Sequence, residues 1–178
     1  MLIESASTGY RMEVSSEHRA MTDSVIEQKF LNLNEYKGAA YVWDFPGYNY
    51  DAEDTVMFLR NDSDTHLHIH HIYLYCDTAT KLQVHIPASP TAAGTAVTGV
   101  NLNQTSGNVA EATAKQDETG NTQGTILHSE YIAANGEKTI FKEEGYEIIL
   151  GKNDCIAVDL VTAGTMAYGH IVGYFHSD

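Results

Sequence analysis

Four of the nine histidines of this sequence fall in one short run, His66-Leu67-His68-Ile69-His70-His71. Imidazole is the commonest metal ligand among protein side chains, and it also titrates near neutral pH. In a regular strand His66, His68 and His70 share one face, about 6.8 Å apart in steps of two residues, so two of them could reach one ion. Regular alternation places His71 on the opposite face, where we expect it to lie at an interface.

This run has two interpretations. A His-x-His pair on a sandwich strand resembles the start of a cupin metal site, and His128 or His170 could supply a distant ligand. However, no Glu follows the pair at the needed distance, and no Pro-x-Gly-x-x-His segment comes later. The alternative is that the imidazoles are hydrogen-bonding groups on a half-exposed strand. We therefore expect no resident cofactor and keep a cupin-like metal-binding protein as a second alternative.

Other catalytic motifs are missing from the sequence. It contains no phosphate-binding glycine loop, dinucleotide fingerprint, nucleophile elbow or His-Glu-x-x-His helix. The run from Asp62 to Asp64 starts like a calcium loop, but Leu67 stands where that loop needs Gly and Tyr73 where it needs Glu. Cys76 and Cys155 lie in alternating apolar runs, which favours buried thiols. We expect a protein that is not an enzyme.

Aromatic residues give a second signal. The chain has eleven tyrosines, and residues 36–50 contain Trp43, Tyr48 and Tyr50 among six aromatic side chains. Tyrosine combines a large apolar body with a polar tip, which suits protein interfaces and sugar stacking. We expect residues 44–50 to form an exposed aromatic loop, with Trp43, Tyr48 and Tyr50 as interface residues.

Charge narrows the class of partner. The 178 residues include 10 Lys plus Arg and 24 Asp plus Glu, for a net charge of −14. Binding to nucleic acid or to an anionic membrane surface needs a basic stripe, which this sequence lacks. No stretch approaches the 18 or so apolar residues of a membrane span. We expect a soluble protein made in a cytoplasm, with neither nucleic acid nor membrane as partner.

The pattern along the chain predicts an all-β protein. Residues alternate with period two in runs rich in Val, Ile, Tyr, Phe and Thr, separated by turn residues. This predicts an antiparallel β-sandwich or barrel, with a core that includes Val56, Phe58, Leu82, Val84, Ile156, Val158 and Leu160. The expected strands are residues 10–15, 18–22, 39–45, 55–61, 66–76, 81–87, 125–133, 138–142, 147–150, 154–162 and 167–176.

Three segments do not fit that sandwich pattern. Residues 23–33 have apolar positions at helical spacing and predict the one helix. Residues 1–22 read as an N-terminal arm, so the sandwich domain covers residues 23–178. Within that domain residues 88–124 form a long polar excursion, in which residues 109–114 could add a strand, and we expect it to pack against a neighbouring copy.

The sequence resembles a family of tailed-bacteriophage virion proteins, the head decoration or cement proteins. The resemblance is carried by residues 9–14 running into 18–21, by Val-Asn-Leu-Asn-Gln-Thr-Ser-Gly at 100–107, and by Ile-Ile-Leu-Gly-Lys-Asn-Asp at 148–154. It implies a jelly-roll-like sandwich that trimerises on the outside of an icosahedral head and bridges its capsomers. The implied partners are the major capsid protein and other copies of this chain, and the implied location is the virion. Similar sandwiches in tail tips and fibres make a carbohydrate- or receptor-binding adhesin the first alternative.

The arm is the segment expected to contact the shell. Its apolar side chains have no core of their own, as expected of a segment that becomes ordered on a partner. Its two arginines are its only basic anchors. The candidate contact residues in the arm are Tyr10, Arg11, Met12, Val14 and Arg19.

Overall fold

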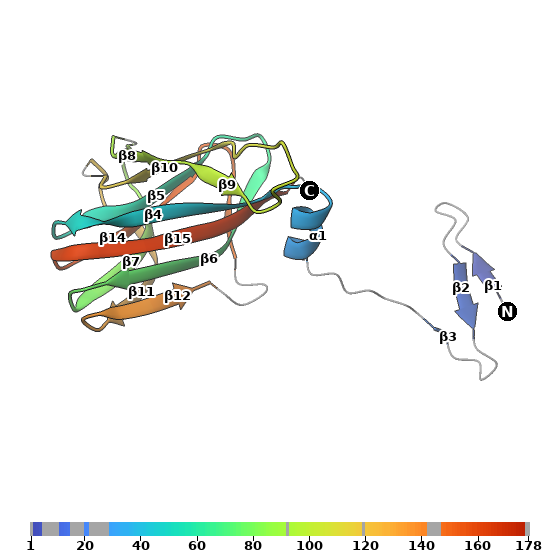
Figure 1. Ribbon diagram of the computed structural model, residues 1–178, viewed down its shortest axis with the longest axis horizontal. Coiled ribbons are helices and arrows are strands. Elements are labelled where there is room, and N and C mark those ends of the chain that lie inside the picture. Colours follow the sequence, from blue (N-terminus) through green and yellow to red (C-terminus); the bar gives the residue numbers. More distant parts are fainter. Residues whose placement is uncertain are drawn as a thin grey trace.

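Two antiparallel β-sheets pack face to face and enclose the core (Figure 1). The structure is a computed structural model that describes residues 2–4, 11–14, 20–21, 29–91, 93–118, 120–141 and 147–176. No helix within these ranges is long and apolar enough to cross a membrane. The expected all-β sandwich is confirmed.

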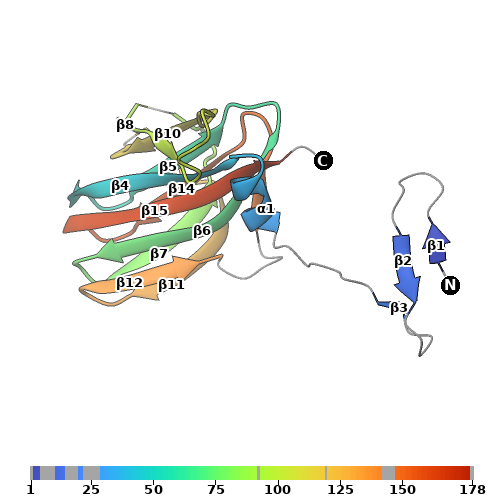
Figure 2. The ribbon, with the colours of Figure 1, turned by 45° about the vertical axis from the view of Figure 1, so that its right-hand side comes forward.

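The sheet that carries the histidine run is called the histidine sheet. Its central strand is the last strand of the chain, which Figure 2 shows between two other long strands. The hydrogen-bonded order is β12 (Gly136–Ile140), β6 (His66–Cys76), β15 (Gly164–His176), β4 (Ala40–Tyr50) and β9 (Gly99–Asn101). A further short strand, β13 (Ile148–Leu150), pairs with the first residues of β6.

The second sheet lies behind it. Three of its strands are buried over most of their length: β5 (Asp54–Asn61), β7 (Thr80–Ile86) and β14 (Cys155–Leu160). The hydrogen-bonded order is β11 (Thr125–Ile132), β7 (Thr80–Ile86), β14 (Cys155–Leu160), β5 (Asp54–Asn61), β10 (Ala112–Gln116) and β8 (Thr95–Val97).

The connectivity is that of a jelly roll. Strands pair in nested fashion, first with last: β4 with β15, β5 with β14, β6 with β12, and β7 with β11. Consecutive pairs of this set alternate between the two sheets, so that the first and third pairs lie in the histidine sheet and the second and fourth in the other sheet. An antiparallel ribbon rolled up in this way gives two four-stranded sheets joined by Greek-key connections. The expectation of a jelly-roll-like sandwich is therefore confirmed.

The core lies between the inner faces of the two sheets. Trp43, Phe45, Ile72 and Leu74 of the histidine sheet are at most 1% exposed. All seven core residues predicted from the alternation are buried, although Phe58 packs with Cys155 on the other face of its sheet. Cys76 and Cys155 are free and buried, as expected.

The long excursion is ordered against its own sandwich. Its three strands extend both sheets, since β10 pairs with β5 and β9 with β4. The carboxylate of Glu118, 1% exposed, accepts hydrogen bonds from the Thr91 hydroxyl (2.6 Å) and from the backbone N–H groups of Ala93 and Gly120 (both 2.7 Å). The described residues of this excursion therefore pack on their own sandwich. Contact with a neighbouring copy stays a prediction.

Residues 44–50 belong to β4 and do not form a loop. Trp43 and Tyr50 are 0% and 1% exposed, and the half-buried Tyr48 accepts a hydrogen bond from the backbone N–H of Asp117 at 3.0 Å. The expected exposed aromatic loop is therefore wrong. Tyr41, Trp43 and Phe45 alternate along β4, and their side chains lie in the core between the two sheets.

Helix and arm were predicted in part. The helix α1 (Lys29–Glu35) includes residues 29–33 of the predicted 23–33 and continues to Glu35, whereas residues 23–28 lie outside the described part of the chain. The strands β1 (Leu2–Glu4), β2 (Arg11–Val14) and β3 (Ala20–Met21) form a three-stranded sheet of their own. Two of them match predicted strands, and β1 was not predicted. Tyr10 and Arg19 lie outside the described residues.

Candidate functional site

A β-bulge at His70 decides which way the histidines point. In the pairing of β6 with β15, Ile69 lies opposite Gly173 and His71 opposite Val172, so His70 is an extra residue without an opposite number. A bulge of this kind shifts the alternation of a strand by one position. Leu67 and Ile69 before the bulge therefore share the inner face with Ile72, Leu74 and Cys76 after it, all at most 1% exposed.

The predicted division of faces is corrected by this bulge. His66, His68 and His70 do not share a face with Ile72, Leu74 and Cys76, as regular alternation requires. Instead they share the outer face of the histidine sheet with His71, Tyr73 and Tyr75. Opposite them, β15 presents Tyr168, His170, Tyr174 and His176. We call these ten side chains the aromatic ladder.

Rings of the aromatic ladder stack across the two strands. Tyr75 stacks on Tyr168 with ring centroids 4.7 Å apart, and Tyr73 stacks on His170 at 5.1 Å. His68 and Tyr174 stack at 4.9 Å with ring planes 10° apart. Cross-strand aromatic pairs of this kind stabilise a sheet and hold each ring in one orientation.

Three imidazoles form a chain at the centre of the aromatic ladder. His70 Nδ1 lies 2.9 Å from His71 Nδ1, and His71 Nε2 lies 3.3 Å from His170 Nε2. Burial, together with the neighbouring His70 and His170, lowers the pKa of His71 to about 4. Burial also lowers the pKa of His170, against the opposing effect of the Asp44 carboxylate. Both half-buried rings are therefore neutral at pH 7.

One end of the aromatic ladder, which contains His68, His70 and Tyr174, packs against α1. Phe30 of that helix lies 4.6 Å from the ring of His70 and 5.8 Å from Tyr174. The Tyr174 hydroxyl donates a hydrogen bond of 2.8 Å to the Glu147 carboxylate, which also lies 3.1 Å from His68 Nδ1. His68 is thereby buried, at 4% exposure.

The predicted metal set does not assemble. His68 is directed to Glu147 and Tyr174, whereas His70 is directed to Phe30 and His71. Across the described residues, no group of three His, Cys, Asp or Glu side chains is arranged to hold a metal ion. The cupin-like alternative therefore lacks the site built from His66, His68 and His70.

At the other end of the aromatic ladder, which contains Tyr73, Tyr75 and Tyr168, two tyrosine hydroxyls donate hydrogen bonds to neighbouring side chains. The Tyr73 hydroxyl donates a hydrogen bond of 2.7 Å to Glu137, which raises the pKa of Tyr73 to about 12. The Tyr75 hydroxyl donates to the Asn135 side chain at 3.1 Å. Tyr168, 38% exposed, and Met166, 47% exposed, leave this end open to a partner.

His85, which is not part of the aromatic ladder, lies on the outer face of the second sheet. His85 Nε2 is 2.7 Å from Asp159, whose other oxygen accepts a hydrogen bond of 2.7 Å from the Thr55 hydroxyl. A nucleophilic triad needs the hydroxyl on the imidazole, but here the carboxylate stands between them. All three residues are at most 3% exposed. This network therefore joins β7, β14 and β5 and has no catalytic order.

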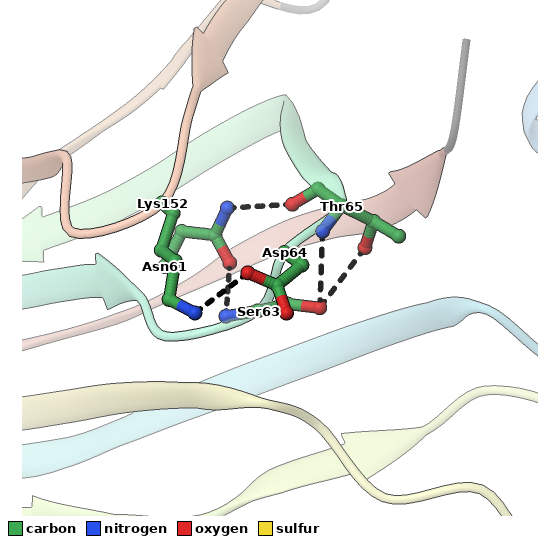
Figure 3. A network of polar contacts seen from close by, with 5 residues as sticks. All are labelled: Asn61, Ser63, Asp64, Thr65 and Lys152. Carbon is green, nitrogen blue, oxygen red and sulfur yellow. Dashed lines mark hydrogen bonds and ion pairs between the residues drawn. The ribbon is translucent and has the colours of Figure 1, made fainter.

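The acidic run after β5 forms a turn (Figure 3). The buried Asn61 amide donates hydrogen bonds to the backbone oxygens of Thr65 (2.7 Å) and Leu150 (2.9 Å) and accepts one from Ser63 N–H (2.9 Å). Asp64 faces outward and pairs with Lys152 at 2.6 Å. These contacts agree with the sequence argument against a calcium loop.

Two open cavities lie away from the aromatic ladder. One of about 430 Å³ lies between the turn after β5 and the segment before β10, and its lining includes Tyr41, Ser63, Thr65, Glu111 and Phe175. The other, of about 450 Å³, lies between β11 and β13. No described histidine lines either cavity. The imidazoles of the aromatic ladder lie on the outer face of the histidine sheet, as the register of β6 and β15 places them.

Sequence reasoning missed half of this surface. It selected His71, named His170 only as a possible distant metal ligand, and did not select Tyr168 or Tyr174 on the partner strand. Their spacing along β15, with Tyr168, His170, Tyr174 and His176 at steps of two or four, carried a signal for a shared outward face. The pairing of β15 with β6 could not be read from either strand alone.

Comparison with known proteins finds no match among family models, curated proteins or solved structures. The contacts of the aromatic ladder are then the main guide to function. They describe a rigid outer face, ordered by stacked rings, with half-buried imidazoles at its centre and exposed apolar side chains at one end.

Proposed function

We propose that this chain is a non-enzymatic structural protein of a tailed-phage virion. It decorates and stabilises the capsid exterior as a homo-oligomer, most simply a trimer, with the major capsid protein as its other partner. The starting point is the resemblance carried by residues 9–21, 100–107 and 148–154 to head decoration proteins. A jelly roll is the fold which that resemblance implies.

The observation that carries the proposal is the aromatic ladder. Its tyrosines and imidazoles lie on an outer sheet face, whereas enzyme and small-molecule sites are concave. Tyrosine and methionine are enriched at protein interfaces, and Tyr168 and Met166 are exposed here. Because the rings stack on one another, they are held in place before binding, which lowers the entropy cost of docking. A flat, ordered face of this kind suits another protein surface.

The arm supports a second contact. Its strands β1, β2 and β3 pair with one another and, among the described strands, with none of the sandwich. A sheet of nine paired residues is too small to bury a core of its own. An arm of this kind gains order by docking, and the capsid shell is the surface we assign to it.

The charge supports a protein partner. A net charge of −14 keeps free copies apart in solution and disfavours contact with phosphate-rich surfaces. Neither nucleic acid nor a membrane is therefore proposed as a partner. The proposed location is the virion surface, reached after synthesis in the host cytoplasm.

The adhesin alternative loses the residues on which it was based. An aromatic loop from Trp43 to Tyr50 was to form the sugar platform, but Trp43 and Tyr50 are buried in the core, and the half-buried Tyr48 accepts a hydrogen bond from Asp117 N–H. The stacked pair of Tyr75 and Tyr168 offers no replacement, since each ring covers a face of the other. We therefore do not carry the adhesin forward as a second function.

A binding assay with phage heads tests the proposal. Heads assembled without this protein are mixed with the purified chain and sedimented, and we expect saturable binding and heads that resist heat better. Deleting residues 1–22 should leave a folded oligomer that no longer binds. Tyr168→Ser should weaken binding, whereas Tyr131→Ser, at a tyrosine 64% exposed on β11, should not.

One result would refute the capsid assignment, and another would refute the role of the arm. Heads that bring down no protein would exclude capsid decoration. Equal binding by the chain lacking residues 1–22 would exclude the arm as a shell contact. Circular dichroism of each variant establishes that it is folded before it is compared.

A further inference from the structure

We propose that His71 and His170 form a binding site for a divalent transition-metal ion of the zinc, nickel or copper type, through the Nε2 atom of each ring. Imidazole nitrogen is a preferred ligand for these metals. The site is not the predicted set of His66, His68 and His70. It also does not depend on the proposed function, because a decoration protein can bind a metal ion or lack one.

The distance between the two nitrogen atoms carries the inference. Zinc binds histidine nitrogen at about 2.0–2.1 Å in tetrahedral geometry, which puts two such ligands about 3.3 Å apart. His71 Nε2 and His170 Nε2 lie 3.3 Å apart. The spacing therefore needs no movement of the backbone to accept an ion between the rings.

The bulge in β6 creates this pairing. If β6 alternated regularly through His70, with no bulge, His71 would face the core. The bulge turns it outward, next to His170, which lies opposite Tyr73 in the register of the two strands. His71 and His170 are both half-buried, so the pair can be reached from the outer face.

Neighbouring rings orient both ligands. His71 Nδ1 lies 2.9 Å from His70 Nδ1, and the ring of His70 packs against Phe30. A histidine that ligates through one nitrogen commonly donates the N–H of the other to a fixed acceptor. His70 supplies that acceptor for His71. The ring of His170 is held by stacking on Tyr73, 17° from parallel.

Metal binding at this pair changes the tautomer of His170 and releases no proton to solvent. With the His71 proton on Nδ1, the contact between the two Nε2 atoms needs the His170 proton on Nε2. Binding then moves this proton to Nδ1 of the same ring, so that both Nε2 lone pairs face the ion and both imidazoles stay neutral. The chain supplies two ligands within its described part, and water completes the coordination.

Asp44 adds negative charge beside the pair. It lies opposite His170 in the pairing of β4 with β15 and is exposed. A carboxylate near a cation site lowers the electrostatic cost of bringing the ion to the surface. Its role is electrostatic, because no third described side chain converges with the two imidazoles.

Calorimetric titration of the metal-stripped full chain with Zn²⁺ tests the site. We expect one ion per chain and, in His170→Ala, an affinity lower by at least about tenfold, the loss typical of a disturbed metal site. His70→Ala, which removes the acceptor for His71 and a contact with Phe30 but neither metal ligand, should cause a smaller loss. The matched control is His66→Ala, on the same strand and face but outside the pair, and it should bind as the unaltered chain does.

Nitrogen NMR of the histidine rings provides the second measurement. Zinc should shift the Nε2 resonances of His71 and His170 in the unaltered chain. This measurement needs no variant, and therefore it tests the site even if a substituted chain fails to fold. The proposal is overturned if the unaltered chain binds no Zn²⁺, if His170→Ala binds as tightly, or if the ion shifts other rings and not these two. In those cases the 3.3 Å contact is a hydrogen bond between imidazoles only.

Discussion

His71 links the stability of the fold to pH. Burial beside His70 and His170 lowers its pKa to about 4, against an ordinary value near 6.5 in the unfolded chain. Between these values the unfolded chain binds more protons, so acidification lowers the free energy of unfolding. The contribution of His71 is complete above pH 6.5 and is lost as the pH falls to about 4. The lowered pKa of His170 acts in the same direction.

Urea unfolding at pH 7.5 and pH 5 measures this effect. Because His71 is half-exposed, we expect it to account for a loss of only about 1 kcal/mol of unfolding free energy at pH 5. His71→Gln keeps a polar side chain but cannot titrate, so it should lose less stability than the unaltered chain over the same range. Equal losses in the two proteins would contradict the assignment to His71.

Asn61 is the second residue with a testable role. It is 0% exposed, and its amide makes three hydrogen bonds that join the turn after β5 to the end of β13. Replacing Asn61 with Ala leaves buried backbone groups without partners, at a cost of about 2–4 kcal/mol. The exposed ion pair of Asp64 with Lys152 gives the control, since water screens this pair and Asp64→Ala should change stability much less than Asn61→Ala. Thermal unfolding that shows equal losses would contradict this account.

Single residues were predictable where the pattern alone decides burial. Val84 and Val158 sit in alternating strands and are buried as expected. Trp43 and Tyr50 were misjudged, because their aromatic side chains suit an interface as well as a core, and the strand continues through residues 44–50. The buried contact of His85 with Asp159 joins residues 74 positions apart, and only the pairing of β7 with β14 brings them together.

Elements with strong alternation were predicted closely. Strand β6 begins and ends as expected, and β5 begins one residue earlier than expected. Strands β8 and β9 were missed because they are three residues long and rich in small side chains. They are strands because β10 and β4 offer open edges for pairing. The bulge in β6 was missed for a similar reason, since it is defined by the partner strand.

Gly169 tests how closely β15 approaches β6. A Cβ atom at this position would lie 2.0 Å from the backbone oxygen of Tyr73 and 2.4 Å from the side chain of Met57. Because backbone cannot give way as a side chain can, Gly169→Ala should destabilise the fold by about 2–3 kcal/mol. The matched control is Gly107→Ala, whose Cβ would meet nothing within 4 Å. Chemical unfolding of both variants is the measurement, and equal stability would contradict the packing described.

At the scale of the molecule, alternation predicted the sandwich and resemblance suggested the jelly roll. The nested pairing of β4 with β15 and of β5 with β14 joins opposite ends of the domain, and no local pattern specifies it. The same holds for the functional face. Each of β6 and β15 shows its aromatic residues in the sequence, but only their pairing makes them one surface.

The proposed function requires a closed oligomer. Closed cyclic symmetry leaves no growing end, and a trimer is what the resemblance to decoration proteins implies. We expect light scattering after size-exclusion chromatography to give three times the mass of one chain at micromolar concentration. A monomer under these conditions would contradict the oligomer, while a dimer would retain self-association but exclude the trimer.

The central claim, that this protein decorates a phage head, is tested most directly by electron cryomicroscopy of the intact virion. The account predicts density for a two-sheet jelly roll on the outer surface of the capsid, repeated with the symmetry of the shell and absent from particles made without this chain. Density for the same sandwich at the tail tip or along a fibre, with a bare capsid, would contradict the claim.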